Sequence, residues 1–455
     1  MSKEEALSTA LELLENRKYS ELRTILIDME PIDIALLCEG LPEEKLPVVY
    51  RILPKELAAE TFVELDAELQ ELLIKSFSDK ELNEVLRELY LDDTVDIIEE
   101  MPASVVRRIL NTSSPEDRAA INELLKYPTD SAGSIMTTEY ISLKGSMTVA
   151  EAFDRIRATG VDKETIYTCY VTDDNRRLTG VVTVKELLLN QYTEHIGSIM
   201  DDNVLYAATG EDKESVAEKF KRYDLLALPV VDNENRLVGI ITVDDAIDVL
   251  TEETTEDIEK MAAITPSDKP YLKTGAFVIF AKRIPWLLLL MISATFTGGI
   301  IGSFESALAV LPVLTAFIPM LMDTGGNSGS QASVTVIRGL ALGEIRPADF
   351  LRVVWKEMRV AALCGITLAA ATFGKILLVD RLIMGNETVS VLVAFTVSLT
   401  LAITVLAAKL VGCMLPLAAK CLHFDPAVMA SPFITTIVDA ISLLVYFAIA
   451  SSILL

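Results

Sequence analysis

The chain from residue 271 to its end contains five long apolar runs, and this feature constrains the fold more than any other. Each run approaches the ~20 residues that a helix needs to cross the hydrocarbon core of a bilayer. Because lipid offers no hydrogen-bond partners to an open backbone, we predict an all-α membrane domain over 271–455. Its five expected spans are 285–303, 307–342, 358–379, 389–417 and 428–455.

The second apolar run is interrupted by the polar stretch 319–345, PMLMDTGGNSGSQASVTVIRGLALGEI. The stretch combines one acid, Asp323, with closely spaced glycines and a string of short polar side chains. Small residues alone are typical of a tight helix crossing. The acid and the many oxygen atoms favour a second interpretation, in which irregular backbone at membrane depth lines a water-filled permeation path.

Charge divides the chain at the same place. Residues 271–455 hold 12 Lys and Arg against 9 Asp and Glu, whereas the residues before them hold 28 against 57. The overall net charge of −26 therefore comes from a strongly acidic N-terminal portion. Such a surface repels nucleic acid and attracts cations. The five cysteines are scattered without a CxxC pair, so they indicate neither a disulfide framework nor a zinc site.

Residues 1–130 predict short helices only, arranged as an α-helical superhelix. Leucines recur at helical spacing, and segments such as Ser114-Pro115-Glu116 place proline and acids in the first turn of a helix. Asp92 and Asp96 fall one turn apart on one helix face. Taken alone, this pair is interpreted as a solvated surface.

Residues 131–243 contain an internal repeat. The repeated segments are Gly133-Ser-Ile-Met136 with Gly197-Ser-Ile-Met200, and Leu178-x-Gly180-Val-Val-Thr183-Val-Lys-Glu186 with Leu237-x-Gly239-Ile-Ile-Thr242-Val-Asp-Asp245. Each copy predicts β-branched strands around a turn, then a threonine N-cap and an amphipathic helix. The double match closely resembles a tandem pair of cystathionine-β-synthase-type (CBS) domains, which have an α/β fold. The resemblance implies dimers and an adenine nucleotide such as ATP in the cleft, with Glu186 and Asp245 placed to hold its ribose.

Residues 244–270 predict one acidic helix that links the repeat to the membrane portion. Carboxylates follow one face of this helix at spacings of three and four residues: Asp245, Asp248, Glu252, Glu256 and Glu259. Like charges at this spacing destabilise an isolated helix. We therefore expect water and salt, a basic partner or divalent ions to compensate them.

Basic residues indicate how the spans are oriented. Lys282 and Arg283 precede the first span, whereas the loop around Glu305 holds no lysine or arginine. Five basic residues lie at 338–359, between the second and third spans. The positive-inside rule then places the N-terminal portion in the cytosol and the C-terminus outside, in a cell (inner) membrane crossed several times.

The last span carries Asp439 near its centre. A carboxylate at that depth costs about 2.5–3.5 kcal/mol on insertion scales unless it faces a partner or a watery path. Lys375 and Lys409 are the alternative partners for an ion pair. The preferred interpretation is a cation site, and its oxygen ligands suit a hard ion that keeps most of its water, which favours Mg²⁺.

The chain resembles the MgtE family of magnesium channels and transporters in two respects. One is the order of its parts: an α-helical domain, a CBS pair, an acidic helix and five spans. The other is the motif TGGNxGxQ at 324–331 together with Asp439. The resemblance implies a homodimer in the lipid bilayer, with Mg²⁺ as substrate and regulator and no enzymatic activity. It implies that Asp439 is the pore carboxylate, flanked by Gly326, Ser330, Val334 and Ser431. The implied ligands of regulatory Mg²⁺ are Asp92, Asp96, Asp212, Glu214, Asp224, Asp245, Asp248, Glu253, Glu256, Asp257 and Asp425.

Four positions depart from the family pattern. Ser330, Val334 and Ser431 stand where Asn or Thr is usual, and Asp323 stands where glycine is usual, which adds a second acidic metal ligand near the filter. The departure keeps open an alternative function, the transport of other divalent cations such as Mn²⁺, Ca²⁺ or Co²⁺. For gating, we expect repulsion among cytosolic acids to open the pore at low Mg²⁺, and bound ions to close it.

Two other classes of protein fit the sequence less well. An intramembrane metalloprotease needs an HExxH motif, but the chain has only His195 and His423. A nucleotide-sensing CBS scaffold without transport activity would leave Asp439 and the stretch 319–345 unexplained.

Overall fold

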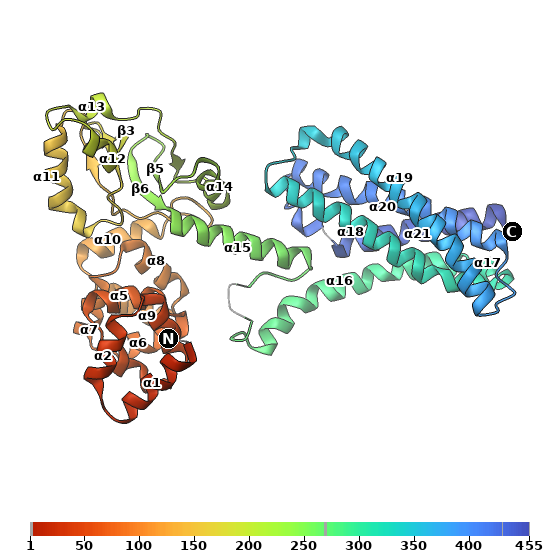
Figure 1. The fold of residues 1–455 in the computed structure, drawn as a ribbon, viewed down its shortest axis with the longest axis horizontal. Coiled ribbons are helices and arrows are strands. Elements are labelled where there is room, and N and C mark those ends of the chain that lie inside the picture. The colour runs from red at the N-terminus through yellow and green to blue at the C-terminus, as the bar shows by residue number, and fades with distance from the viewer. Residues whose placement is uncertain (1–2, 268–270, 430, 455) are drawn as a thin grey trace. The chain divides into compact units, whose positions relative to one another are not determined.

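The computed structural model describes residues 3–267, 271–429 and 431–454 and forms two compact units, Met1–Leu250 and Thr251–Leu455. Helix α15 (Val243–Met261) contains the point where the first unit ends and the second begins (Figure 1). The first unit combines short helices with two small sheets, whereas the second is helical throughout its described part.

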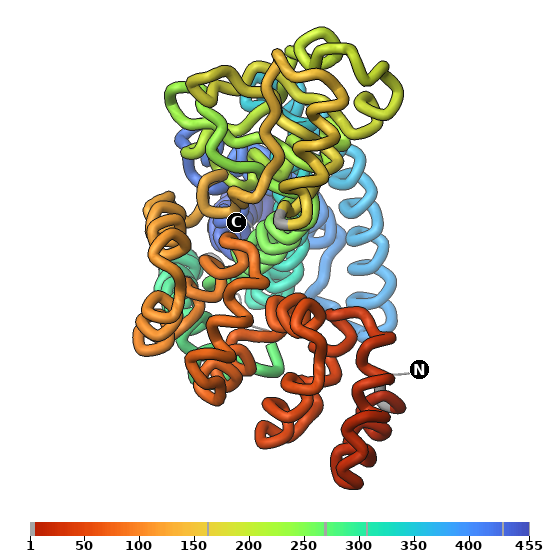
Figure 2. The backbone as a smooth tube through the Cα atoms, turned by 90° about the vertical axis from the view of Figure 1, so that its left-hand side faces the viewer, coloured from red at the N-terminus to blue at the C-terminus, as the bar shows by residue number. Residues whose placement is uncertain are grey.

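The first unit begins with ten short helices that follow one another through the red and orange part of the chain (Figure 2). Some of their N-termini carry the predicted sequence signals, whereas others, such as those of α2 and α5, have no side-chain cap. Proline starts α10, and the Ser114 side chain accepts a hydrogen bond from the Asp117 amide at 3.0 Å. The bounds are α1 Lys3–Glu15, α2 Tyr19–Ile27, α3 Pro31–Glu39, α4 Leu46–Tyr50, α5 Lys55–Val63, α6 Ala67–Ser76, α7 Asp79–Leu86, α8 Leu91–Glu100, α9 Ala103–Thr112 and α10 Pro115–Leu124.

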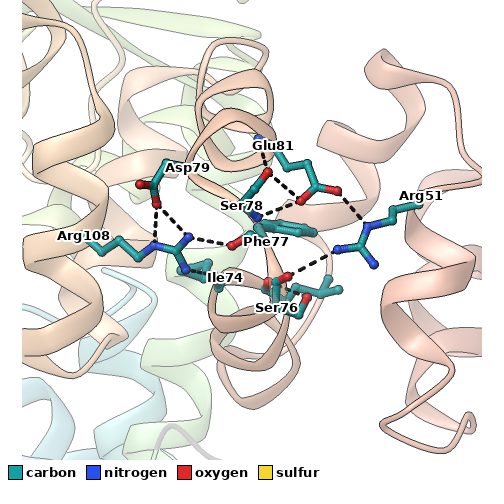
Figure 3. Close-up of polar contacts among 9 residues, drawn as sticks. Arg51, Ile74, Ser76, Phe77, Ser78, Asp79, Glu81 and Arg108 are labelled. Carbon is teal, nitrogen blue, oxygen red and sulfur yellow. Dashed lines mark hydrogen bonds and ion pairs between the residues drawn. The ribbon is translucent and has the colours of Figure 1, made fainter.

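The start of α7 is held by arginines from two other segments (Figure 3). Arg51 donates to Glu81 at 2.7 Å, and Arg108 of α9 donates to Asp79 at 2.9 Å. Arg108 also donates to the carbonyl oxygens of Ile74 and Phe77. A guanidinium group can satisfy several acceptors at once because its donors are fixed in one plane. These contacts tie α6, α7 and α9 together.

The internal repeat forms two three-stranded sheets with the same order, in which the first strand pairs parallel and the third antiparallel to the second. Equivalent irregularities fall at Val171/Thr172 and Val230/Val231. The bounds are β1 Ser142–Leu143, α11 Val149–Thr159, β2 Thr168–Thr172, β3 Leu178–Thr183, α12 Val184–Leu189, α13 Ile196–Ile199, β4 Ala207–Ala208, α14 Lys213–Tyr223, β5 Ala227–Val231 and β6 Leu237–Thr242. The tandem CBS-like arrangement predicted from the repeat is confirmed.

In each copy of the repeat, the residue that follows the Gly-Ser-Ile-Met segment pairs with a strand of the other copy. Thr137, which follows the first segment, exchanges backbone hydrogen bonds of 2.8 and 2.9 Å with Ile240 of β6. Asp201, which follows the second, exchanges two bonds of 2.9 Å with Val181 of β3. This exchange joins the two copies. Apolar residues of the short helices, β4, β5, β6 and α15 also form one continuous core, so the N-terminal helices fold against the second copy.

The second unit contains the long apolar helices. Its bounds are α16 Ala276–Ser303, α17 Glu305–Val310, the 3-10 turn Pro312–Phe317, α18 Ile318–Ala341, the 3-10 turn Pro347–Asp349, α19 Phe350–Lys375, the π-helical segment Ile376–Ile383, α20 Val391–Cys421, the 3-10 turn Ala427–Met429 and α21 Ser431–Ile453. Helices α18, α20 and α21 pack against one another, and α19 packs along α20. Helix α16 buries none of its described residues fully and contacts α21, where Trp286 meets Phe433 edge to face.

Among the described residues, four helical segments are long and apolar enough to cross a membrane: 276–303, 347–383, 391–421 and 427–453. Helix α18, which covers most of the remaining expected span, has 24 residues but carries the polar stretch, which lowers its hydropathy. The irregular backbone expected in this stretch is wrong, because α18 is a continuous helix as far as Ala341.

Candidate metal-binding sites

Carboxylates from distant parts of the sequence gather in the first unit. Asp92 and Asp93 lie in the first turn of α8, Asp96 lies one turn later, and Asp245 lies in the first turn of α15. Burial and then the neighbouring Asp93 and Asp245 raise the pKa of Asp92 to about 9. Burial and Asp245 raise the pKa of Asp96 to about 7. Asp92 is half-buried rather than solvated, whereas Asp96 is exposed, as the interpretation of a solvated surface predicts.

The cluster includes acids that the sequence did not single out. Burial, followed by the charges of Asp93 and Asp244, raises the pKa of Glu164 to about 7. The pKa of Glu64 is raised by burial and by Asp248. These residues come from α5, α8, α15 and the segment before β2. Only the tertiary fold brings them together, so no local pattern could have found them.

Two opposing effects act on the pKa of the Asp245 carboxyl group. Its Oδ2 accepts a hydrogen bond of 2.7 Å from the Thr242 hydroxyl, which favours the charged form. Burial is the larger effect, and the pKa of Asp245 rises to about 6. Glu186, at the equivalent position of the first copy, forms a capping box with Thr183. The structure thus gives both predicted ribose ligands a place at the start of a helix.

The cluster can attract a cation without enclosing it. The neighbouring charges that raise these pKa values belong to other acids, and Asp92 Oδ1 is buried without a hydrogen-bond partner among the described residues. Over the same residues, no three His, Cys, Asp or Glu side chains are arranged as a ready-made metal site. An ion that keeps part of its hydration shell, as Mg²⁺ does, fits such a loose set of oxygens.

The predicted ligands on α14 are not brought together. Asp212 caps the start of α14 by accepting from the Ser215 amide at 3.2 Å, and Glu214 lies in the first turn. Asp224 ends the helix in a left-handed conformation with φ of 52°. Because α14 has 11 residues and rises about 1.5 Å per residue, its two ends lie too far apart to share one ion.

A second acidic group lies in the Thr251–Leu455 unit, at the end of α15. Lys260 Nζ lies 2.5 Å from Glu256 and 2.7 Å from Asp425, which precedes the 3-10 turn before α21. Burial favours the neutral amine, but the hydrogen bonds that Lys260 donates to the carboxylates of Asp425 and Glu256 outweigh it and raise the pKa of Lys260. The pKa of Asp257 is raised by burial and by Asp425. Three predicted Mg²⁺ ligands therefore meet here, and Lys260 already bridges two of them. Glu253 lies on the same helix.

The membrane helices meet at glycines of the polar stretch. A Cβ atom added to Gly325 would lie 2.8 Å from Thr404 of α20 and 2.9 Å from Ser442 of α21. Gly326 lies directly against Thr435 of α21, and Gly329 lies against Gly412 of α20. The close packing of helices explains these glycines, as the first interpretation of the stretch proposed.

The exposed polar side chains of α18 lie on a different face from the glycines, whereas Ser328 and Ser333 are buried. The exposed residues of this face recur at helical spacing and are Asp323, Asn327, Gln331, Val334, Thr335 and Arg338. Ser330 is half-buried beside them, and Ser431 begins α21, although its side chain lies outside the described residues. Sequence alone did not separate the packing face from the polar face.

Asp439 of α21 is half-buried, and its carboxylate lies close enough to Asp323 for their charges to repel. Lys375 is paired with Asp380 at 2.9 Å instead. Lys409 is only 4% exposed in α20, and within the described residues it forms no ion pair with Asp439. Asp439 and Asp323 thus form a pair of acids at membrane depth.

Helices able to span a membrane, a CBS pair and carboxylates in both units define a membrane protein of the ion-transporting class that carries CBS domains. The chain belongs to the MgtE family. The family descriptions "Divalent cation transporter", "MgtE intracellular N domain" and "CBS domain" match residues 318–449, 29–130, and 132–191 with 196–252.

Relatives cover nearly the whole chain. The magnesium transporter MgtE of Thermus thermophilus is 37% identical over 98% of this chain and 98% of its own length. The magnesium transporter MgtE of Bacillus subtilis is 31% identical over 99% and 98%. A crystal structure of the cytosolic domain of the Mg²⁺ channel MgtE in complex with ATP is 37% identical, covers 53% of this chain and 99% of that one, and superposes with a TM-score of 0.51.

Proposed function

We propose that this protein carries Mg²⁺ across a cell membrane through a pore formed by two copies of the chain. The observation that carries the proposal is the pair Asp439 and Asp323 beside the exposed polar face of α18. Charged and amide side chains at membrane depth are costly against lipid. A second copy facing this stripe would enclose it, and the enclosed oxygens would supply a path for a hydrated divalent ion.

The test is Mg²⁺ entry into liposomes that contain the purified protein and an internal dye. Asp439→Asn should abolish most of the flux, because it removes the carboxylate at the centre of the last span. Glu387→Gln, a neutralisation of an exposed acid between the π-helical segment and α20, is the matched control and should leave the flux unchanged. Equal flux in wild type and Asp439→Asn would refute a pore at this residue. No flux of any divalent ion would favour a CBS scaffold without transport.

Asp323 supports a second candidate, a pore that passes other divalent cations. Mn²⁺, Ca²⁺ and Co²⁺ give up hydration water more readily than Mg²⁺, so a second carboxylate that can bind the ion directly favours them. Asp323→Gly should reduce entry of these ions relative to Mg²⁺. An unchanged ratio would leave Mg²⁺ as the principal substrate.

We further propose that cytosolic Mg²⁺ closes the pore by binding the acidic clusters. The proposed domains are 1–130, the CBS pair 131–243, the linker 244–270, in which α15 ends at Met261 and would plug the pore, and a membrane domain 271–455 with α18 as the fifth span. The N-terminus would lie in the cytosol and the C-terminus outside. Within the first unit, acids such as Asp92 and Asp245 repel one another, and within the second unit Asp257 is repelled by Asp425. A divalent ion would relieve the repulsion in each unit.

Neutralising Asp248 and Glu256 together tests the gating proposal. The double variant should keep transporting when Mg²⁺ on the cytosolic side is high, because fewer ions would hold the closed state. Preserved shut-off would contradict it. ATP in the CBS cleft, with Glu186 and Asp245 on its ribose, is a separate proposal supported by the ATP-bound relative. Titration of ATP into wild type and Glu186→Ala would test that proposal.

A further inference from the structure

A polar cavity of about 610 Å³ lies among the N-terminal helices, and none of its lining residues belongs to the acidic clusters described above. Its walls are α7 and α9, and none of its eight lining residues is aliphatic or aromatic. The lining residues are Asp79, Lys80, Asn83, Ser104, Arg107, Arg108, Asn111 and Thr112. Three cations against one carboxylate make this cavity basic within a strongly acidic cytosolic portion.

Part of the lining holds the two walls in place. Arg108 is fixed by Asp79 and by two backbone carbonyl oxygens (Figure 3). The Asn83 side-chain amide of α7 donates to the carbonyl oxygen of Thr112 in α9 at 2.8 Å. The only carboxylate in the lining is therefore already compensated by Arg108. These contacts preorganise the cavity, which lowers the entropic cost of binding.

The remaining donors are available to a ligand. Arg107 is exposed and makes no hydrogen bond or ion pair within the described part of the chain. The Lys80 side chain is 87% exposed, and its nearest carboxylate, that of Glu84, is 3.9 Å away. Ser104 and Asn111 add a hydroxyl and an amide from α9. A planar guanidinium with neighbouring ammonium and neutral donors is the set that binds phosphate oxygens.

We propose that the cavity binds a phosphate monoester carried by a small molecule or a lipid headgroup. Its volume lies within the range of small-molecule sites, and its polar lining suits a ligand that is mostly charged and hydroxylated. The cationic lining repels Mg²⁺, so the site is separate from the proposed metal sites and does not depend on the proposed transport function.

The experiment is calorimetric titration of glycerol 3-phosphate into the full chain in detergent without divalent ions. We expect saturable binding to the wild type, and binding at least tenfold weaker in the double variant Lys80→Gln/Arg107→Gln. The matched control Arg17→Gln/Arg23→Gln removes the same charge from exposed residues of the N-terminal helices and should bind as wild type does.

A second variant protects the test against misfolding. Asn111→Asp keeps both cations and places a carboxylate in the cavity, so it should also weaken binding while the circular dichroism spectrum stays unchanged. Equal affinity in all variants, or heat that never saturates, would overturn the proposal. The same titration in lipid nanodiscs then distinguishes a lipid headgroup from a soluble phosphate ester as the ligand. Competition by phosphatidic acid in the bilayer supports a lipid headgroup, and its absence supports a soluble phosphate ester.

Discussion

Lowering the pH from 8 to 6 should stabilise the first unit when divalent ions are absent. Asp92, Asp93, Asp96, Glu164 and Asp245 have pKa values raised to between about 6 and about 9 in the folded chain. The folded chain therefore binds more protons than the unfolded chain across this range. The stability that these groups contribute is fully present below their ordinary carboxyl pKa and is lost as the pH rises through the folded values.

The magnitude follows from the individual pKa values. Glu164, which is half-buried and has a pKa of about 7, contributes about 1.4 kcal/mol between pH 8 and pH 6. Asp92, at about 9, contributes about 2.6 kcal/mol over the same interval. The groups interact and titrate together, so we expect about 3 to 6 kcal/mol for the cluster as a whole.

Urea unfolding of residues 1–262, followed by circular dichroism, measures this difference, because that segment contains the whole first unit and all of α15. Asp92→Asn should flatten the pH dependence by about 2 kcal/mol. Glu88→Gln, on the exposed surface just before α8, should leave it unchanged and so controls for net charge. Mg²⁺ should stabilise the wild type more at pH 8 than at pH 6, because protons compete for the same oxygens. Stability that stays constant or rises between pH 6 and pH 8 would refute the buried cluster.

Two further predictions concern the second unit. Without divalent ions, Lys260→Gln should increase the rate of hydrogen exchange of residues 251–261 about fivefold, because a partly buried ion pair contributes about 1 kcal/mol. Mg²⁺ should restore the protection. An unchanged exchange rate would mean that Lys260 does not hold this end of α15. Gly412→Ala should lower the unfolding free energy in detergent by about 1–3 kcal/mol, because the new methyl group would meet the Gly329 carbonyl oxygen. Gly374→Ala has open space around it and serves as the control; equal effects of the two substitutions would contradict the close helix contact.

The sequence predicted those parts of the fold that depend on local patterns. Thr183 and Thr242 precede helices as expected, because a threonine after a buried strand is a strong N-cap signal. The acidic helix appeared as α15 because its residues alternate apolar and charged positions at helical spacing. The polar stretch was misjudged because glycine and serine are compatible with both irregular backbone and close helix packing.

The candidate sites were only partly accessible from the sequence. Asp92 and Asp96 were correctly placed on one face, but nothing local indicates that Asp245, far along the chain, covers them. The ion pair between Lys260 and Asp425 could not be predicted either, because it depends on where α15 ends relative to the turn before α21. Long-range contacts of this kind are determined by packing rather than by residue patterns.

The two copies of the repeat use an equivalent acidic residue in different ways. Glu186 and Asp245 occupy equivalent positions after equivalent strands, and each accepts a hydrogen bond from the threonine that caps its helix. Only the second copy extends this helix to 19 residues and places its acid against α8. The same capping position therefore serves only the helix in the first copy, whereas in the second copy its acid also joins the carboxylate cluster around α8.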